Sequence, residues 1–301
     1  MFDRKYWKTT HFENEIISVG NLSVGGTGKT PLVCYLIEQN IEKKRIAVLS
    51  RGYGRKTKGI VIADEFATTK SIGDEAYFLY QKYGDRIIVA VAEKRTEGVE
   101  ALNQYIQPDL IVLDDAFQHR WIHRNQNILL TDFENLFTED YILPLGKLRE
   151  NRKSAKRATQ IIITKCPPKI PKAKQERIKE SVKQYSSANV SFSFISYSKL
   201  VQVSGKEINN PKYIIGVCGI AKPLYFKNYL NSSYELLDFV VYKDHHDYTL
   251  KDIEVIKSKM KTYQRETVLV VTEKDWVKLK KFQVNMKGIH VFVLPIRLTF
   301  L

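Results

Sequence analysis

The sequence predicts an α/β protein with two domains: a large three-layer α/β/α domain on a mostly parallel sheet, and a smaller α/β domain. Short, almost entirely apolar segments alternate with segments whose apolar residues recur at helical spacing. This alternation is typical of parallel strands with helices on both faces. It is interrupted over 190–211, where short strand-like stretches and turns replace it. We therefore expect domains at 1–189 and 212–301, joined by a short strand-rich linker over 190–211.

The elements follow in order along the chain. In the first domain, strands are expected at Ile16–Val19, Ile46–Leu49, Ile87–Val91, Leu110–Leu113, Ile128–Thr131 and Ile161–Thr164. Helices are expected at Thr30–Asn40, Asp74–Tyr83, Thr96–Tyr105 and Lys172–Tyr185. In the second domain, strands at Tyr213–Val217, Leu236–Val241, Val268–Thr272 and Val291–Leu294 accompany helices at Pro223–Leu230 and Leu250–Thr262. In such parallel sheets, ligands bind beyond the carboxyl ends of the strands.

Composition indicates a globular protein that binds anions. The 301 residues are 44% hydrophobic and 27% charged, which is ordinary for a soluble domain. The formal net charge of +15 attracts nucleotides, nucleic acids or an acidic membrane surface. No segment approaches the roughly 20 apolar residues that span a bilayer. Cys34, Cys166 and Cys218 have no metal-site spacing, and we expect buried thiols in a reducing compartment.

A glycine-rich turn follows the first strand and leads through Gly28-Lys29-Thr30 into the first helix. This order is typical of a phosphate-binding loop (P-loop), in which main-chain N–H groups and a helix N-terminus surround a polyphosphate. Lys29 is expected to reach the β- and γ-phosphates of ATP, and the Thr30 hydroxyl to ligate Mg²⁺. The expected binding residues are Ser23, Val24, Gly25, Gly26, Thr27, Gly28, Lys29 and Thr30. Ser23 stands where the general pattern has glycine, and a glycine-rich turn without a ligand is the alternative.

Two carboxylates, Asp114 and Asp115, follow an apolar strand. In P-loop proteins, an aspartate in this position holds Mg²⁺ or its waters. Because neighbouring strand residues point to opposite faces, we expect one aspartate at the metal and the other at the substrate or a cation. Which of them binds the metal stays open, and two aspartates that start a turn are the alternative. Gln118 and His119 follow closely and could contact phosphate or cap a loop.

Other polar residues at strand and helix ends are candidates for phosphate contact or proton transfer. Asp74 opens a helix, where a helix-capping role is the simpler interpretation and acceptance of a hydroxyl proton is the functional one. Arg51, Arg95 and Arg149 suit bidentate phosphate contacts, although each could be a surface residue. The run 147–157 carries six basic side chains and is expected to face an anionic surface.

In the second domain, Asp244-His245-His246-Asp247 precedes a helix. Adjacent residues rarely converge on one metal ion, so a histidine paired with a carboxylate of the first domain is the better functional hypothesis. A structural histidine remains an equal alternative. Neither 272–275 (Thr-Glu-Lys-Asp) nor 164–167 (Thr-Lys-Cys-Pro) has the order of a guanine-binding motif. This favours ATP over GTP.

Together these segments resemble the tetraacyldisaccharide 4'-kinase family, the lipid A 4'-kinases. The matching segments are, in family order, Val19–Pro31, Ser50–Gly54, Gly73–Glu75, Asp114–His119, Leu143–Gly146 with Arg149-Glu150, Asp244–His246 and Thr272–Asp275. The first is the most specific, because Gly-Asn-Leu leading into Gly-Gly-Thr-Gly-Lys-Thr-Pro is unusual among P-loops. Ser23 is normal for this family.

The resemblance implies a kinase that uses ATP and Mg²⁺. The implied reaction transfers the γ-phosphate to the 4'-hydroxyl of a tetraacylated glucosamine disaccharide 1-phosphate, which gives lipid IVA. Asp74 would be the general base and His245 would orient it and tune its pKa, with Lys29 and Asp115 as further catalytic residues. The resemblance associates Arg51, Arg95, Arg149 and Glu150 with substrate phosphate, nucleotide or metal.

Family members usually carry an apolar N-terminal anchor helix, which we expect this chain to lack. Its basic surface would then bind peripherally to the inner face of the bacterial inner membrane, on the cytoplasmic side. We expect a monomer with no obligate protein partner and no nucleic-acid partner. The alternative function is a P-loop GTPase or ATPase switch that hydrolyses nucleotide without a lipid acceptor. A nucleic-acid-binding ATPase is suggested by charge alone.

Overall fold

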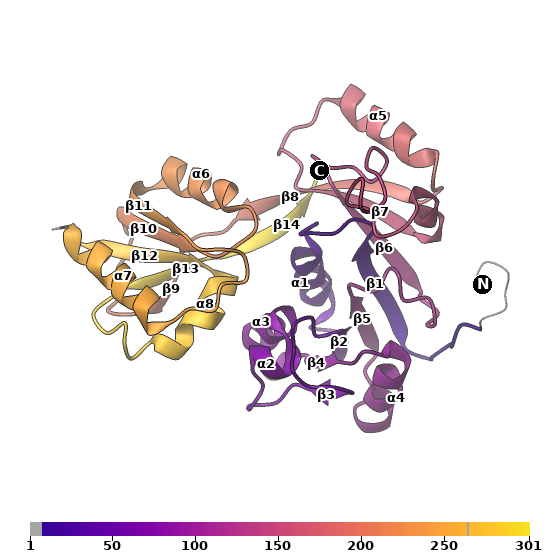
Figure 1. Cartoon of the computed structure of the whole chain (residues 1–301), viewed down its shortest axis with the longest axis horizontal. Helices are drawn as coiled ribbons and strands as arrows, with labels where there is room; N and C mark the ends of the chain where they lie inside the picture. The colour runs from indigo at the N-terminus through magenta and orange to yellow at the C-terminus, as the bar shows by residue number, and fades with distance from the viewer. Residues whose placement is uncertain (1–7, 264) are drawn as a thin grey trace. The chain divides into compact units, whose positions relative to one another are not determined.

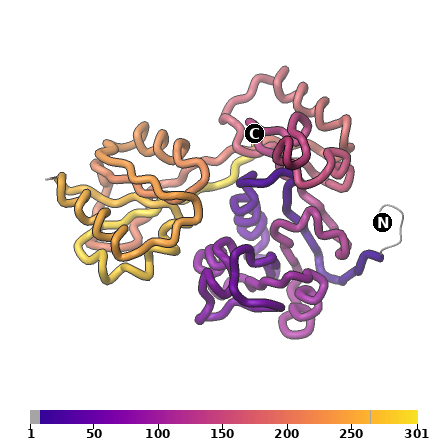
Figure 2. The backbone as a smooth tube through the Cα atoms, in the orientation of Figure 1, coloured from indigo at the N-terminus to yellow at the C-terminus, as the bar shows by residue number. Residues whose placement is uncertain are grey.

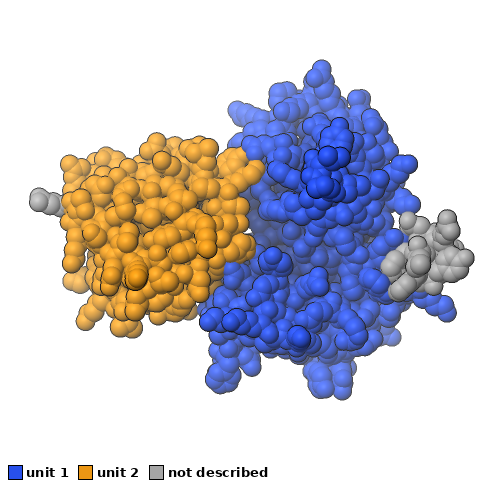
Figure 3. Space-filling model, in the orientation of Figure 1, with its two compact units in different colours: residues 1–195, 298–301 blue, residues 196–297 orange. Residues whose placement is uncertain are grey.

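The computed structural model describes residues 8–263 and 265–301. The chain forms two compact units, coloured separately in Figure 3: unit 1 holds residues up to 195 together with 298–301, and unit 2 holds 196–297. The chain passes from unit 1 to unit 2 along β8 (Asn189–Tyr197) and returns along β14 (Ile296–Phe300), as the trace in Figure 2 shows.

Unit 1 is built on a nine-stranded sheet in the order β14-β8-β7-β6-β1-β5-β2-β4-β3 among the described residues (Figure 1). Its other strands are β1 (Glu15–Asn21), β2 (Ile46–Ser50), β3 (Val61–Ile62), β4 (Ile88–Val91), β5 (Leu110–Asp114), β6 (Gln126–Asp132) and β7 (Gln160–Thr164). All pairs from β8 to β4 are parallel, and β3 is antiparallel to β4. The predicted α/β/α architecture on a mostly parallel sheet is confirmed.

Helices cover both faces of this sheet because its strands are apolar on both sides. The helices of unit 1 are α1 (Lys29–Asn40), α2 (Thr69–Ile72), α3 (Asp74–Tyr83), α4 (Arg95–Tyr105) and α5 (Lys172–Lys183), with short 3₁₀ turns η2 (Gly84–Arg86) and η3 (Arg152–Arg157). Val99 and Leu102 of α4 join one buried cluster with β2 and β5. Ile178 and Val182 of α5 join another with β6 and β7. Helix α1 packs on β1 and β5.

The parallel strands β1, β2, β4, β5, β6 and β7 all end at the same edge of the sheet. The P-loop follows β1, the loop carrying Arg51 follows β2, and Asp115 follows β5. Gly20 of β1 allows the loop after β5 to pass close to β1, because a Cβ at Gly20 would lie 2.7 Å from the backbone nitrogen of Phe117. The candidate residues of unit 1 therefore gather at the carboxyl edge, where such sheets bind ligands.

Unit 2 is a smaller α/β unit on a five-stranded sheet in the order β11-β10-β12-β13-β9, counted over the described residues. Its strands are β9 (Val201–Ser204), β10 (Tyr213–Cys218), β11 (Glu235–Val241), β12 (Thr267–Thr272) and β13 (Val291–Leu294). Its helices are α6 (Pro223–Ser233), α7 (Leu250–Thr262) and α8 (Glu273–Leu279), followed by η4 (Lys280–Phe282). Among the described strands of this sheet, β9 runs antiparallel to its neighbour β13, and the other pairs are parallel.

The unit boundaries differ from the expected domains at two places. Residues 190–197, expected in a linker, belong to the long strand β8 of the large sheet, while β9 already belongs to the sheet of unit 2. The end of the chain, expected in the second domain, returns to the large sheet as β14. Both differences have one cause: β8 and β14 are neighbours in space but about a hundred residues apart in sequence, so no local pattern indicates their pairing.

Candidate active site

The P-loop leaves β1 and turns into α1 through glycines with left-handed backbone angles. Gly25 has φ 100° and Gly28 has φ 86°, values that other residues rarely adopt. Gly28 is the N-cap of α1, so Lys29 and Thr30 open the helix where its N-terminal N–H groups point outward. Apart from the adjacent residues, no atom of the described chain lies within 4 Å of a Cβ built on Gly25 or Gly26. The loop therefore faces open space, as a cradle for a polyphosphate requires.

Hydrogen bonds from neighbouring strand ends fix the loop. Asn21 donates from its side-chain amide to the Thr27 hydroxyl over 2.7 Å. Thr164, at the end of β7, donates to the Thr27 carbonyl oxygen over 2.8 Å. Lys165 donates to the Gly26 carbonyl oxygen and forms an ion pair of 2.9 Å with Asp132. These contacts hold the loop in its open conformation.

The backbone N–H of Val24 has a partner inside the protein. It donates to the Lys147 carbonyl oxygen over 2.8 Å, and the adjacent Ser23 forms a β-bridge with Leu148. Ser23 thus stands in a short bridged segment that needs no glycine. We therefore expect the amides that contact phosphate to begin at Gly25.

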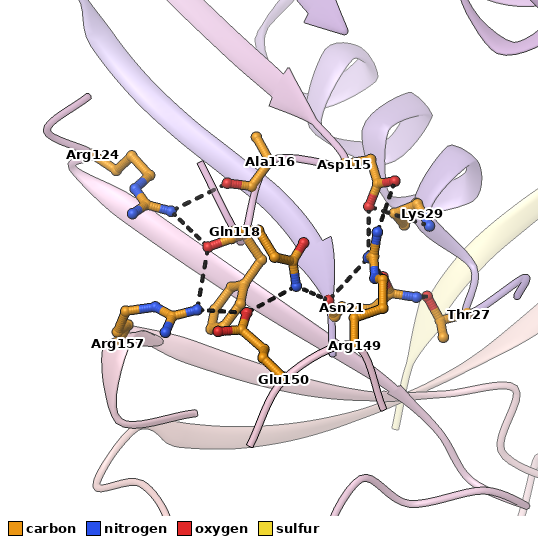
Figure 4. Close-up of polar contacts among 11 residues, drawn as sticks. Asn21, Thr27, Lys29, Asp115, Ala116, Gln118, Arg124, Arg149, Glu150 and Arg157 are labelled. Atoms are coloured by element: carbon orange, nitrogen blue, oxygen red, sulfur yellow. Dashed lines mark hydrogen bonds and ion pairs between the residues drawn. The ribbon is translucent and has the colours of Figure 1, made fainter. Parts of the chain in front are cut away.

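Lys29, Asp115 and Arg149 form one charged group beside the loop (Figure 4). The Nζ of Lys29 lies 3.6 Å from an Asp115 carboxylate oxygen. Arg149 contacts both oxygens of the same carboxylate, at 3.0 and 3.4 Å, and also donates to the Asn21 carbonyl oxygen over 3.1 Å. Such a two-point ion pair fixes direction as well as distance. The group places Lys29 and Asp115 side by side at the mouth of the P-loop.

A second group of side chains supports the first. Gln118 donates from its amide to the Asn21 carbonyl oxygen and to Glu150, both over 2.9 Å. Glu150 also accepts a hydrogen bond of 2.8 Å from Arg157. Figure 4 shows this chain of contacts from Arg157 to Asn21. Gln118 and Glu150 therefore hold the end of β1 in place, and phosphate contact by either stays a prediction.

The two carboxylates of these groups remain ionised. Burial alone would raise the pKa of Asp115, but Lys29 and Arg149 outweigh it and hold that pKa below its ordinary value. The pKa of Glu150 is likewise raised by burial and lowered more strongly by Arg157 and other hydrogen-bond donors. Two anionic oxygens of Asp115 are thus present at neutral pH.

Arg149→Gln should reduce kcat/KM by about ten- to a hundredfold, the range for losing hydrogen bonds to a charged group. Without the guanidinium, the pKa of Asp115 rises, so the carboxylate is lost at a higher pH as the solution is acidified. The acid limb of the pH–rate profile is therefore expected to move toward neutral pH. The exposed Arg177→Gln on α5 is the matched control. If the acid limb of Arg149→Gln stays where it is in the parent, Arg149 does not hold down the pKa of Asp115.

The aspartates expected at the metal have different environments. Asp114 is buried at the end of β5, whereas Asp115 has a left-handed backbone (φ 48°) that turns it outward to Lys29. Thr30 is buried in the first turn of α1. Within the described residues, no group of three or more His, Cys, Asp or Glu side chains could hold a metal by itself. Mg²⁺ usually takes one or two carboxylates plus substrate phosphates, so hard oxygens from Thr30 and these aspartates fit it.

Asp74 and the arginine-bearing loops lie at the same sheet edge. Asp74 is the first residue of α3, and Gly73 before it packs so closely that a Cβ would lie 2.7 Å from the Tyr53 carbonyl oxygen. Arg51 is exposed in this packed loop. Arg95 is 4% exposed and donates to the Ala92 carbonyl oxygen over 2.7 Å. Burial lowers the pKa of Arg95 to about 10, although the negative charge of Asp114 acts in the opposite direction and raises it.

His119 is neutral at physiological pH. Burial, followed by the charges of Arg95 and Arg124, lowers its pKa to about 4. Its Nε2 is buried and has no hydrogen-bond partner among the described residues. Any phosphate contact through His119 would therefore come from an uncharged imidazole, not from an imidazolium.

The depressed pKa of His119 predicts a loss of stability in acid. Between pH 6.5 and about pH 4 the unfolded chain binds more protons at this ring than the folded chain, so the free energy of unfolding falls as pH drops through this window. His119→Gln is expected to flatten that part of the profile, measured by urea unfolding at pH 4.5 and pH 7.5. The exposed His123→Gln is the control. Equal slopes for His119→Gln and the parent would contradict the prediction.

In unit 2, the two neighbouring histidines differ. His246 lies 3.0 Å from Asp252 and stacks on Tyr242 with ring centroids 4.5 Å apart. His245 has φ 59° and a half-exposed side chain, and its Nε2 lies 3.9 Å from an Asp244 carboxylate oxygen. His246 thus has a structural role, which supports His245 as the functional member. Its pairing with Asp74 of unit 1 stays a prediction.

A buried carboxylate holds the loop that carries these histidines. Asp275 accepts hydrogen bonds from the Gly219 N–H over 3.0 Å, the Tyr248 hydroxyl over 2.9 Å and the Thr272 hydroxyl over 2.5 Å. Burial raises the pKa of Asp275 above its usual value. The segment 272–275, compared above with guanine-binding motifs, thus holds the residue after β10 and the residues before α7 together within unit 2.

Sequence reasoning assigned no role to several residues that build the site. They are Asn21, Thr164, Lys165 and Arg157. Asn21 lies inside the segment that carries the resemblance, and Thr164 and Lys165 stand at a strand end, where a polar residue is a signal. Arg157 was included only as part of a basic run.

The glycine cradle at a helix N-terminus, with a lysine beside a strand-terminal aspartate, defines a P-loop nucleotide-binding protein. A family model described as Tetraacyldisaccharide-1-P 4'-kinase matches residues 1–300. The chain belongs to this family.

Relatives and a solved structure agree with that assignment. The Tetraacyldisaccharide 4'-kinase of Flavobacterium johnsoniae is 40% identical over 308 residues, covering 100% of this chain and 87% of the relative. That of Phocaeicola vulgatus is 39% identical over 314 residues, covering 100% and 86%. A crystal structure of LpxK from Aquifex aeolicus in complex with ATP matches with a TM-score of 0.76 and 28% identity, covering 100% of this chain and 88% of that one.

Proposed function

We propose that the chain is an ATP-dependent kinase that phosphorylates the 4'-hydroxyl of tetraacyldisaccharide 1-phosphate, giving lipid IVA in lipid A biosynthesis. The observation that carries the proposal is the open P-loop with Lys29 beside Asp115, in a chain that belongs to the 4'-kinase family. The structural relative was solved with ATP, which supports the choice of nucleotide.

In this proposal, the amides from Gly25 onward and Lys29 bind the triphosphate and stabilise charge that develops on the transferred group. Thr30, Asp114 and Asp115 would hold Mg²⁺, which when bound supplies positive charge to the phosphate oxygens. Arg149 keeps Asp115 ionised and correctly directed. Arg51 and Arg95 add positive charge at the same sheet edge. Transfer thus depends mainly on positioning and electrostatics.

Asp74 is proposed to accept the proton of the acceptor hydroxyl, with His245 orienting the carboxylate. A carboxylate at a helix N-terminus is normally a weak base, so a partner that raises its proton affinity during transfer has a physical role. A positioned base contributes about 10²–10⁴ in rate.

We further propose that the enzyme works at the inner face of the bacterial inner membrane, attached peripherally. The net charge of +15 supports this location, since each Lys or Arg near an anionic surface contributes about 1 kcal/mol. In the described part of the chain, no helix combines the length and the apolar character that crossing a bilayer requires.

The proposal is tested by incubating the protein with ATP, Mg²⁺ and the disaccharide 1-phosphate, and following the acceptor by mass spectrometry. The expected product is heavier by one phosphate, and lipid IVA, whose 4'-position is already occupied, should gain none. Release of the γ-phosphate to water at the same rate with and without acceptor would contradict the proposal and favour a nucleotide-hydrolysing switch.

A further inference from the structure

Four large apolar side chains are exposed together at one loop of unit 1, the segment 141–145, called here the apolar tip. Tyr141 is 64% exposed, Ile142 45%, Leu143 50% and Leu145 87%, and Pro144 lies between the last two. Along the rest of the described sequence, exposed large apolar residues occur singly or, at Leu224 and Tyr225, as one adjacent pair. Contiguous exposed apolar groups of this kind mark an interaction site.

The apolar tip is a built turn. Leu143 and Leu148 are joined by a backbone hydrogen bond of 3.0 Å, and the Leu148 N–H donates to the Tyr141 carbonyl oxygen over 2.9 Å. Gly146 has no room for a Cβ, which would collide with the Tyr141 carbonyl and the Asp140 carboxylate. The apolar side chains are therefore presented outward by a fixed backbone and do not collapse onto the core.

The same turn is attached directly to the P-loop. Leu148 forms a β-bridge with Ser23, and the Val24 N–H donates to the Lys147 carbonyl oxygen over 2.8 Å. On the other side, the Arg149 N–H donates to the Leu22 carbonyl oxygen over 2.7 Å. Whatever the apolar tip binds is thus held close to the phosphate-binding loop.

The basic run that follows the tip has two kinds of side chain. Arg149, Arg152 and Arg157 are bonded to other groups of the protein: Asp115, the Asp140 carbonyl oxygen and Glu150 respectively. Lys147, Lys153 and Lys156 are exposed. Exposed ammonium groups around apolar side chains complement an anionic lipid surface, in which acyl chains lie beneath phosphate headgroups.

We propose that the apolar tip inserts into the acyl region of an anionic lipid bilayer, with Lys147, Lys153 and Lys156 against the headgroups. Leu143 and Leu145 enter the bilayer, and Tyr141 lies at the interface, which amphipathic rings favour. Insertion brings the P-loop to the membrane surface. This part of the inference rests on the proposed function: the P-loop must reach the membrane surface because the acylated acceptor lies in the bilayer.

The test uses the full chain and a dye sensitive to polarity on Leu145→Cys, since Cys34, Cys166 and Cys218 are all buried. Vesicles contain equal parts of phosphatidylglycerol and phosphatidylcholine. We expect the emission to shift to the blue and to become protected from an aqueous quencher. The matched control is the dye on Phe66→Cys, an 80% exposed apolar position of the same unit, which should not respond.

Leu145→Ser should lower the partition coefficient between vesicles and water, measured by sedimentation, about tenfold. Phe66→Ser should leave the partition coefficient unchanged. Unaltered emission at position 145, or equal partitioning of Leu145→Ser and the parent, would overturn the proposal. A dimer in light scattering that Leu145→Ser abolishes would also overturn it, because a second copy would then occupy the tip.

The outcome is separable from that of the kinase assay. Phosphate transfer without any dependence of vesicle binding on Leu145 would defeat the insertion alone. Vesicle binding that depends on Leu145, with no transfer to any acceptor, would defeat the proposed function alone.

Discussion

Asp74→Asn is expected to lower turnover by about 10²–10⁴-fold while the affinity for ATP changes little. Asparagine keeps the polar group at the start of α3, where the aspartate lies in the first turn, but cannot accept the hydroxyl proton. The measurement is kcat with saturating acceptor, together with ATP-analogue binding by calorimetry. The exposed Asp85→Asn serves as the control.

The same experiment includes His245, because the proposal makes the two residues one functional pair. His245→Gln is expected to lower kcat as well, and the double variant should be little worse than Asp74→Asn alone, since residues that act as a unit are not additive. Loss of ATP binding in Asp74→Asn would instead assign the carboxylate to the nucleotide or metal. Unchanged turnover would leave Asp74 only as an acidic residue in the first turn of α3, whose N-cap is Gly73 and not Asp74 as the sequence suggested.

Lys29→Ala should reduce both ATP affinity and turnover, with kcat falling by about 10²–10³-fold, the range for removing one donor that stabilises transition-state charge. Its Nζ lies 3.6 Å from Asp115 at the mouth of the P-loop, so the variant also removes one of the two positive charges beside that carboxylate and leaves Arg149 at 3.0 Å. Analogue binding and kcat are measured in parallel, with the exposed Lys58→Ala as the control. A variant that binds and turns over like the parent would remove Lys29 from the site.

The buried parallel strands and the helices between them are predictable from the sequence for a local reason. Strands such as β2 and β5 are apolar on both faces, and the Gly-Lys-Thr that opens α1 has few other structural interpretations. Strand β14 lacks such a signal, because its half-buried residues pair with β8, far away in sequence. Helix α8 begins directly at the end of β12, with Thr272 as its N-cap, so its first turn was interpreted only as a motif.

The candidate site also has a part that the sequence predicts and a part that it does not. The P-loop is encoded by a local sequence pattern, and glycines stand where its backbone has positive φ angles. The contacts that hold it are not local: Gln118 and Arg149 reach Asn21 from 97 and 128 residues away, and Thr164 reaches Thr27 from 137. Spacing cannot predict such partners. For the same reason, the sequence of the basic run 147–157 did not show which of its side chains bond to other groups of the protein.

In the proposed complex, the main-chain amides from Gly25 to Thr30 and the Lys29 ammonium bind the phosphates of ATP. Amide ¹⁵N chemical shifts, followed on titration with a non-hydrolysable ATP analogue and Mg²⁺, report this contact residue by residue. We expect the largest shifts at residues 25–30 and at Asp115, and we expect these shifts to disappear in Lys29→Ala. Saturable binding of the analogue that leaves these amides unperturbed would contradict the proposed contact.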